Sequence, residues 1–178
     1  MDEKKKFNVH KIALLGVLTA GTIVIAILES FIPSIGIPGV KLGLANIMIL
    51  VILYELGILE AILVNLARVI SVSLIRGTFL SMGFVMSLTG AAFSLGIMIL
   101  LYLVIRKFSI VGVSVVGSIF HVTGQILIAM IYLGTSYVIF YLPIIGISAI
   151  ITGVLVGFVA KMIIDTGVIK RQKEKYNF

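Results

Sequence analysis

Long apolar stretches, separated by short segments rich in Gly, Pro, Ser or charged residues, make up most of the chain. A helix needs about 20 residues to cross a bilayer, and most of these stretches reach that length. Three of the separating segments, at residues 33–39, 76–83 and 134–136, contain helix-breaking Gly or Pro. The pattern predicts spans at residues 12–32, 40–54, 58–75, 84–105, 110–133 and 137–164.

We therefore expect an all-α integral membrane protein, a six-helix bundle that forms a single membrane domain over residues 1–178. The composition supports this class, because 61% of the residues are hydrophobic and only 12% are charged. A soluble domain has roughly 45–50% apolar and about 25% charged residues. The sequence contains 0 Cys, which excludes disulfides and thiolate metal sites.

The positive charges gather at three span ends. The chain has 14 Lys and Arg against 7 Asp and Glu, and no basic stripe interleaved with aromatic residues suggests a nucleic-acid partner. Since positive residues that flank spans stay in the cytoplasm, an even number of spans predicts that both termini are cytoplasmic. The residues at these three ends are Lys4, Lys5, Lys6, Lys11, Arg106, Lys107, Lys161, Lys170, Arg171, Lys173 and Lys175.

Polar side chains within or at the ends of spans are the candidate binding residues. An ionised group near the bilayer centre costs about 2.5–3.5 kcal/mol on insertion scales, so it faces the bundle interior or a wet cavity. Lys41 and Arg76 also lie on the side that the topology rule leaves poor in cations. We expect substrate contacts from Lys41, Asn46, Asn65, Arg68, Arg76, His121 and Gln125.

Arg68 is the strongest anomaly among them. A guanidinium suits carboxylate and phosphate groups through its fork geometry, but Arg68 could instead form a buried ion pair with Glu29 or Glu60. Lys41 could simply reach the lipid headgroups. Lys41, Arg68 and Arg76 together carry more positive charge than Glu29 can offset. This excess favours a ligand that is amphipathic and anionic.

The fifth predicted span carries one polar stripe. Ser114, Ser118, His121 and Gln125 follow at spacings of four, three and four residues, which places them on one helix face. Such a stripe either lines a cavity or holds a structural His–Gln pair that bonds to neighbouring helices.

Small residues mark helix faces that allow close approach in a membrane. In the last span, Gly153 and Gly157 predict packing inside the bundle. In the first span, Ala13, Gly16 and Ala20 either pack internally or dock a partner subunit near the cytoplasm.

Catalytic signatures are absent from the sequence. There is no Walker motif and no metal-ligand cluster, and the two Asp residues, Asp2 and Asp165, lie near the termini. We therefore predict no catalytic residues, no metal site, no cofactor and no enzymatic activity.

Four sequence features together resemble the Gx transporter family, also labelled heptaprenyl diphosphate synthase component I. They are residues 38–46 (PGVKLGLAN), Arg68, residues 77–79 (GTF) and residues 117–125 (GSIFHVTGQ). The resemblance extends from about His10 to Lys161. That family is similar to the S components of energy-coupling factor (ECF) transporters, which are six-helix membrane proteins that bind a small ligand near the outer surface.

The resemblance implies a prokaryotic plasma membrane location, with docking to a transmembrane coupling subunit and cytoplasmic ATPases. It also implies that Ala13, Gly16 and Ala20 form the docking face, although Val17 interrupts a strict Ala-x-x-x-Ala pattern. A prenyl diphosphate, a quinone precursor or a flavin would fit as ligand. Two alternatives remain: a non-catalytic membrane partner of an isoprenoid- or quinone-synthesis enzyme, and a stand-alone secondary transporter.

Overall fold

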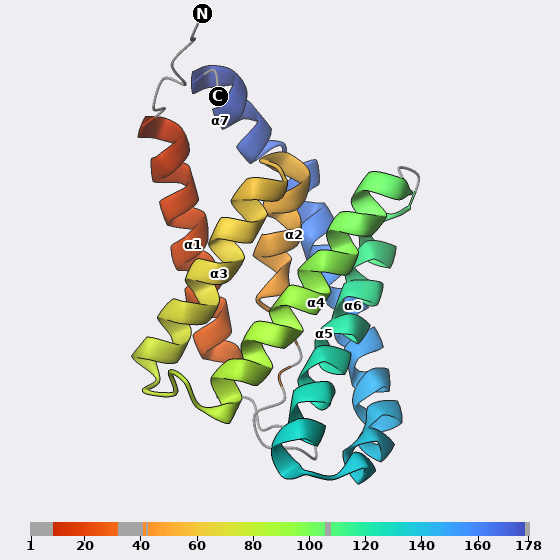
Figure 1. Cartoon of the computed structure of the whole chain (residues 1–178). Coiled ribbons are helices and arrows are strands. Elements are labelled where there is room, and N and C mark those ends of the chain that lie inside the picture. Colours follow the sequence, from red (N-terminus) through yellow and green to blue (C-terminus); the bar gives the residue numbers. More distant parts are fainter. Residues whose placement is uncertain (1–8, 32–40, 42, 106–107, 177–178) are drawn as a thin grey trace, which may run out of the picture.

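The computed structural model describes residues 9–31, 41, 43–105 and 108–176, and all regular secondary structure in these ranges is helical (Figure 1). The basic residues Lys4, Lys5, Lys6, Arg106 and Lys107 lie outside the described residues. So do the predicted break at 33–39 and part of the 38–46 motif.

In the described part of the chain, five helical segments are long and apolar enough to cross a membrane, as expected for a multi-pass, all-α protein. The last of them begins as a short 3₁₀ helix, η1. In chain order the elements are α1 (Val9–Glu29), α2 (Asn46–Glu55), α3 (Ile58–Ile75), α4 (Met82–Val104), α5 (Ile110–Leu133), η1 (Ser136–Tyr141), α6 (Leu142–Asp165) and α7 (Val168–Tyr176).

The predicted second span, 40–54, is a ten-residue helix, α2, which begins only at Asn46. At 1.5 Å per residue it is about 15 Å long, half the thickness of a ~30 Å hydrocarbon core. Gly43 before it and Gly57 after it have φ values of +86° and +124°, which are conformations that glycine adopts readily. The expected count of six spanning helices is therefore not confirmed: the described residues contain five long apolar helical segments and this short helix.

Figure 1 shows α1, α3 and α5 running away from the end of the bundle that holds α7, and α2, α4 and α6 running back toward it. We call these the α7 end and the far end. The rings of His10 and Tyr176 stack with their centroids 3.9 Å apart, which joins α1 to α7. Nearby, Lys11 forms an ion pair with Glu60 of α3.

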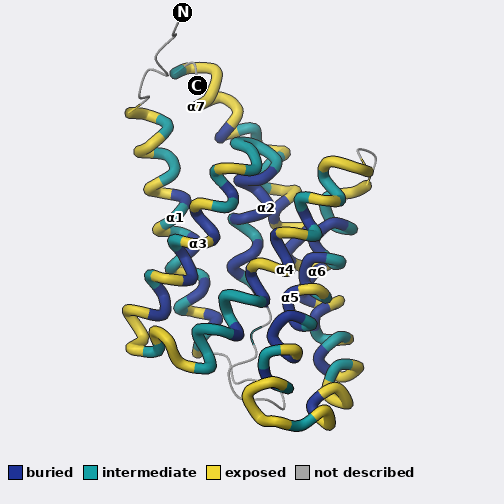
Figure 2. Tube along the Cα trace, viewed as in Figure 1, coloured by how far each residue is buried: buried dark blue, intermediate teal, exposed yellow. Residues whose placement is uncertain are grey.

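Helix α2 is the core of one half of the bundle. Its residues 49–53 have no exposed surface (Figure 2). The sequence explains this position, because these residues are apolar on every side of the helix, and such a helix belongs in an interior. The outer faces of the long helices are apolar too: Leu100, Ile131 and Phe158 are all more than half exposed, as expected for surfaces that meet lipid.

Helix α5 packs closely on α6, as the small residues of the last span predicted. A Cβ atom on Gly157 would lie 2.6 Å from Val111 Cα, and one on Gly153 would lie 2.7 Å from Val115 Cα. Both neighbours are backbone atoms of α5, so the two helices touch at positions that only glycine can occupy.

Candidate functional site

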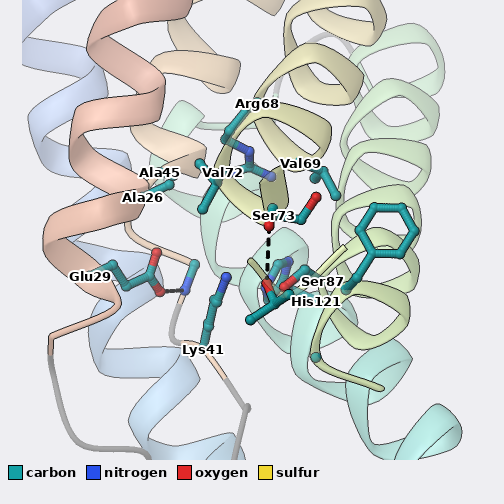
Figure 3. A pocket seen from close by; sticks show the side chains of 14 residues that line it. Ala26, Glu29, Lys41, Ala45, Arg68, Val69, Val72, Ser73, Ser87 and His121 are labelled. Carbon is teal, nitrogen blue, oxygen red and sulfur yellow. Dashed lines mark hydrogen bonds between the residues drawn. The ribbon is translucent and has the colours of Figure 1, made fainter. Parts of the chain in front are cut away.

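A cavity of about 40 Å³ lies between α1, α3, α4 and α5, in the part of the bundle nearer the far end (Figure 3). This volume holds only a few water molecules. A larger ligand must therefore displace side chains or extend beyond the cavity. Its charged and polar lining residues are Glu29, Lys41, Arg68, Ser73, Thr78, Ser87 and His121.

Arg68 projects from the middle of α3 and is only 5% exposed. Its Nη1 donates to Asn46 Oδ1 at 3.3 Å and its Nη2 to Asn65 Oδ1 at 2.7 Å. The two amides are themselves anchored on α4, since Asn46 Nδ2 donates to Ser94 Oγ and Asn65 Nδ2 to the Ala91 carbonyl. These neutral acceptors orient the guanidinium without neutralising its charge.

Neither predicted ion pair of Arg68 forms among the residues that the structure describes. Glu60 pairs with Lys11 instead, so the Glu60 alternative is wrong. Glu29 accepts a hydrogen bond from the Gly43 backbone N–H and is not within ion-pair distance of Arg68. The guanidinium has five N–H donors, and only two of them make the bonds described above.

The electrostatic balance of the cavity is positive. Arg68 and Lys41 are cationic lining residues and Glu29 is the anionic one. Figure 3 shows Glu29 and Lys41 on the side of the cavity away from Arg68. Lys41 is half-buried, so it serves as part of the cavity wall. Among the lining residues that the structure describes, one positive charge is left over, which favours an anion over a neutral or cationic ligand.

His121 presents a further polar atom at this site. Gln125 Oε1 accepts a hydrogen bond from the Lys41 backbone N–H at 2.9 Å. The Nε2 of the same Gln125 side chain therefore donates to Nε2 of His121 at 2.8 Å. The neutral imidazole then carries its proton on Nδ1, which is buried and has no hydrogen-bond partner within the described ranges. His121 therefore contributes a neutral ring to the wall of the cavity.

The polar stripe of α5 divides into two parts. His121 lines the cavity, and Gln125 joins it to the backbone of Lys41, which lies in the non-helical segment before α2. Ser114 and Ser118 instead face the glycines of α6: a Cβ on Gly153 would lie 3.1 Å from Ser118 Oγ. Helical periodicity predicted that the four side chains share one face of α5. This face meets α6 at Ser114 and Ser118, whereas at His121 it meets the cavity.

The remaining predicted residues lie near the cavity or away from it. Asn46, Asn65 and Gln125 hold lining residues and are not part of the wall. Arg76 is exposed at the end of α3 and does not line the cavity. The hydroxyls of Ser73, Thr78 and Ser87 in the cavity wall could not be predicted, because hydroxyl side chains are common in transmembrane helices and carry no distinctive signal.

Ala13, Gly16 and Ala20 are all exposed on α1, at the α7 end. A Cβ on Gly16 would meet no atom within 4 Å. The three residues therefore do not serve internal packing, which was one of the two predicted uses.

The sequence model of one family, described as heptaprenyl diphosphate synthase component I, matches residues 18–163. The match includes all the lining residues of the cavity and the two asparagines that hold Arg68. No curated protein and no solved structure matches the chain. The chain therefore belongs to the heptaprenyl diphosphate synthase component I family.

Proposed function

We propose that this protein is the substrate-binding membrane subunit of a small-molecule transporter and captures an amphipathic anion in the Arg68 cavity. The observation that carries the proposal is a buried guanidinium held by two amide oxygens, with no acidic side chain at ion-pair distance among the described residues. A buried charge without a counter-ion is costly, and a bound anion supplies one.

The proposed topology places the cavity near the outer face of the membrane. If α2 and the residues before it count as one pass, the chain crosses six times, and its described ends meet at the α7 end. Helix α7 carries Lys170, Arg171, Lys173 and Lys175. Such charges favour the cytoplasmic side, in the plasma membrane of a prokaryote. A ligand would then enter from the outer side or from the bilayer.

The exposed small-residue face of α1 is the proposed docking site for a transmembrane coupling subunit, which would in turn bind cytoplasmic ATPases. Ala13, Gly16 and Ala20 leave the α1 backbone accessible, and small residues allow close approach between helices in lipid. The resemblance to ECF S components supports the same arrangement.

The family description supports a second candidate, a non-catalytic membrane partner of an isoprenoid- or quinone-synthesis enzyme, because it names a component of a synthase. In both proposals another subunit does the catalytic work. Isoprenoid chain-elongating enzymes hold Mg²⁺ through clustered carboxylate oxygens, and this sequence has no aspartate-rich motif, since its two Asp residues, Asp2 and Asp165, are widely separated along the sequence.

Affinity purification from native membranes in mild detergent, followed by proteomics, separates the two candidates. We expect a transmembrane coupling subunit and ATPases to co-purify with the wild-type protein. They should be lost with Gly16→Leu, which fills the docking face. Gly146→Leu on α6 is the matched control, since a Cβ there also meets no atom within 4 Å. Recovery of a soluble prenyl synthase without ATPases would contradict transport and favour the second candidate.

A further inference from the structure

A second hollow, a groove of about 270 Å³, adjoins the cavity between α3 and α4, which run side by side in Figure 1. Apart from Asn65, the residues that line it are apolar. Leu66, Ala92 and Gly96 in its walls are exposed on the surface that meets lipid. The groove is therefore open sideways to the bilayer.

The groove and the cavity are neighbours along α3 and α4. Val69 lines both. On α4, the cavity wall of Gly83, Phe84 and Ser87 continues directly into the groove wall, which begins at Leu88. The steps of three and four residues keep both walls on one face of α4. The groove wall on α4 consists of Leu88, Ala91, Ala92, Leu95, Gly96 and Ile99.

The polarity of the lining changes sharply between the cavity and the groove. The cavity has the cations and the hydroxyls, whereas the groove has a single polar side chain, that of Asn65. Asn65 stands at the boundary, because it lines the groove and also accepts the hydrogen bond from Arg68 Nη2. From Leu88 to Ile99 the apolar part extends about 16 Å along the helix axis.

We infer that the groove between α3 and α4 holds the hydrocarbon chain of a linear anionic amphiphile, whose head group binds at Arg68. This inference rests on the proposed anion site and narrows the substrate to single-chain amphiphiles, rather than planar ring systems. The cavity alone is too small for such a ligand. A chain that leaves it along the groove stays in a hydrocarbon environment while its head reaches the buried cation.

The groove exists because small residues of α4 leave space in its wall. Substituting them with larger residues tests whether the groove binds the chain of the ligand. A Cβ on Gly96 would meet no atom within 4 Å, so Gly96→Leu fills the groove without disturbing the packing. Ala92 lies one turn nearer the cavity, so Ala92→Leu should block the groove closer to the head group. Gly146→Leu adds the same side chain to an open position on α6, outside the groove.

The probes are dimethylallyl, geranyl, farnesyl and geranylgeranyl diphosphate, bound to the protein in nanodiscs, with empty nanodiscs as blank. We expect wild-type affinity to rise with chain length by roughly tenfold across the series. In Gly96→Leu the rise should stop at a shorter chain, and in Ala92→Leu at a shorter chain still. Gly146→Leu should match the wild type, and dimethylallyl diphosphate should bind all four proteins equally.

An unchanged chain-length profile in both groove variants would overturn the inference, as would a flat profile in the wild type. If no diphosphate of any length binds the wild type, the anion site itself fails, which is a distinct result. A farnesyl diphosphate analogue with a photoreactive chain end gives a readout that does not depend on the variants. Labelling of α4 near Gly96, or of the facing residues of α3 such as Leu66, supports the inference. Labelling confined to helices other than α3 and α4 overturns it.

Discussion

Arg68→Met is expected to lower the affinity for farnesyl diphosphate by more than about a hundredfold, because charge-assisted hydrogen bonds contribute roughly 1.5–3 kcal/mol each. Arg68 is the buried cation of the cavity, and its unused N–H donors would bind the head group. Met keeps the length of the side chain and removes its charge. Binding to protein in nanodiscs measures the effect.

The folding stability of the same variant tests whether the role is binding or structure. Arg68 has no acidic partner at ion-pair distance within the described part of the chain. Its replacement removes the free-energy cost of a buried charge, and this gain offsets the loss of the hydrogen bonds to Asn46 and Asn65. We expect the melting temperature to change by less than about 5 °C. Lys11→Met, which removes a cation at the α7 end, is the control and should leave farnesyl diphosphate binding intact.

Two outcomes would contradict this assignment. Full affinity in Arg68→Met would show that the head group binds elsewhere. A collapse of stability in the absence of ligand would show that Arg68 holds the helices together, which is the structural role that a buried ion pair would have had.

The largest effect on stability is expected from Gly157→Leu on α6. The new Cβ would lie 2.6 Å from Val111 Cα and 2.8 Å from Ser114 Cβ. A backbone atom cannot move aside as a flexible side chain can, so α5 and α6 must separate. Overpacking of a well-packed interior costs about 1–3 kcal/mol and sometimes more, and we expect the upper end of this range or beyond.

The thermal stability of the purified protein in detergent, followed by size-exclusion chromatography, measures this loss. Gly146→Leu is again the matched control, with the same substitution in the same helix at a position open to lipid. Equal melting temperatures for the two variants would contradict the close α5–α6 contact.

Apolar length was enough to predict the long helices, because a bilayer-spanning helix needs an uninterrupted hydrophobic run. The same criterion failed for α2. Residues 40–54 are largely apolar, but hydropathy does not register the left-handed backbone of Gly43, and α2 begins only at Asn46.

The site could be predicted only within single helices. Asn65 and Arg68 are three residues apart, so their place on one face of α3 follows from helical periodicity. The contact with Asn46 does not follow, because it depends on how α2 enters the bundle. Helix geometry alone could have excluded the Glu60 ion pair, since eight residues along α3 separate the two side chains by about 12 Å.

Arg76 is a residue for which the sequence predicts a binding role that the structure does not support. Its place on the side poor in cations predicts a substrate contact, but the helix ends at Ile75 and Arg76 lies exposed at its cap. A cation at a helix end can reach headgroups or water, and nothing in the sequence distinguishes that from a binding role.

The molecule that the protein retains during purification shows whether Arg68 is the anion site of a substrate-binding subunit. The measurement is mass spectrometry of small molecules that co-purify from native membranes in mild detergent, compared between wild type and Arg68→Met. We predict that a phosphate- or carboxylate-bearing amphiphile is enriched with the wild type and lost with the variant. A neutral or cationic molecule, or equal recovery with both proteins, would contradict the account.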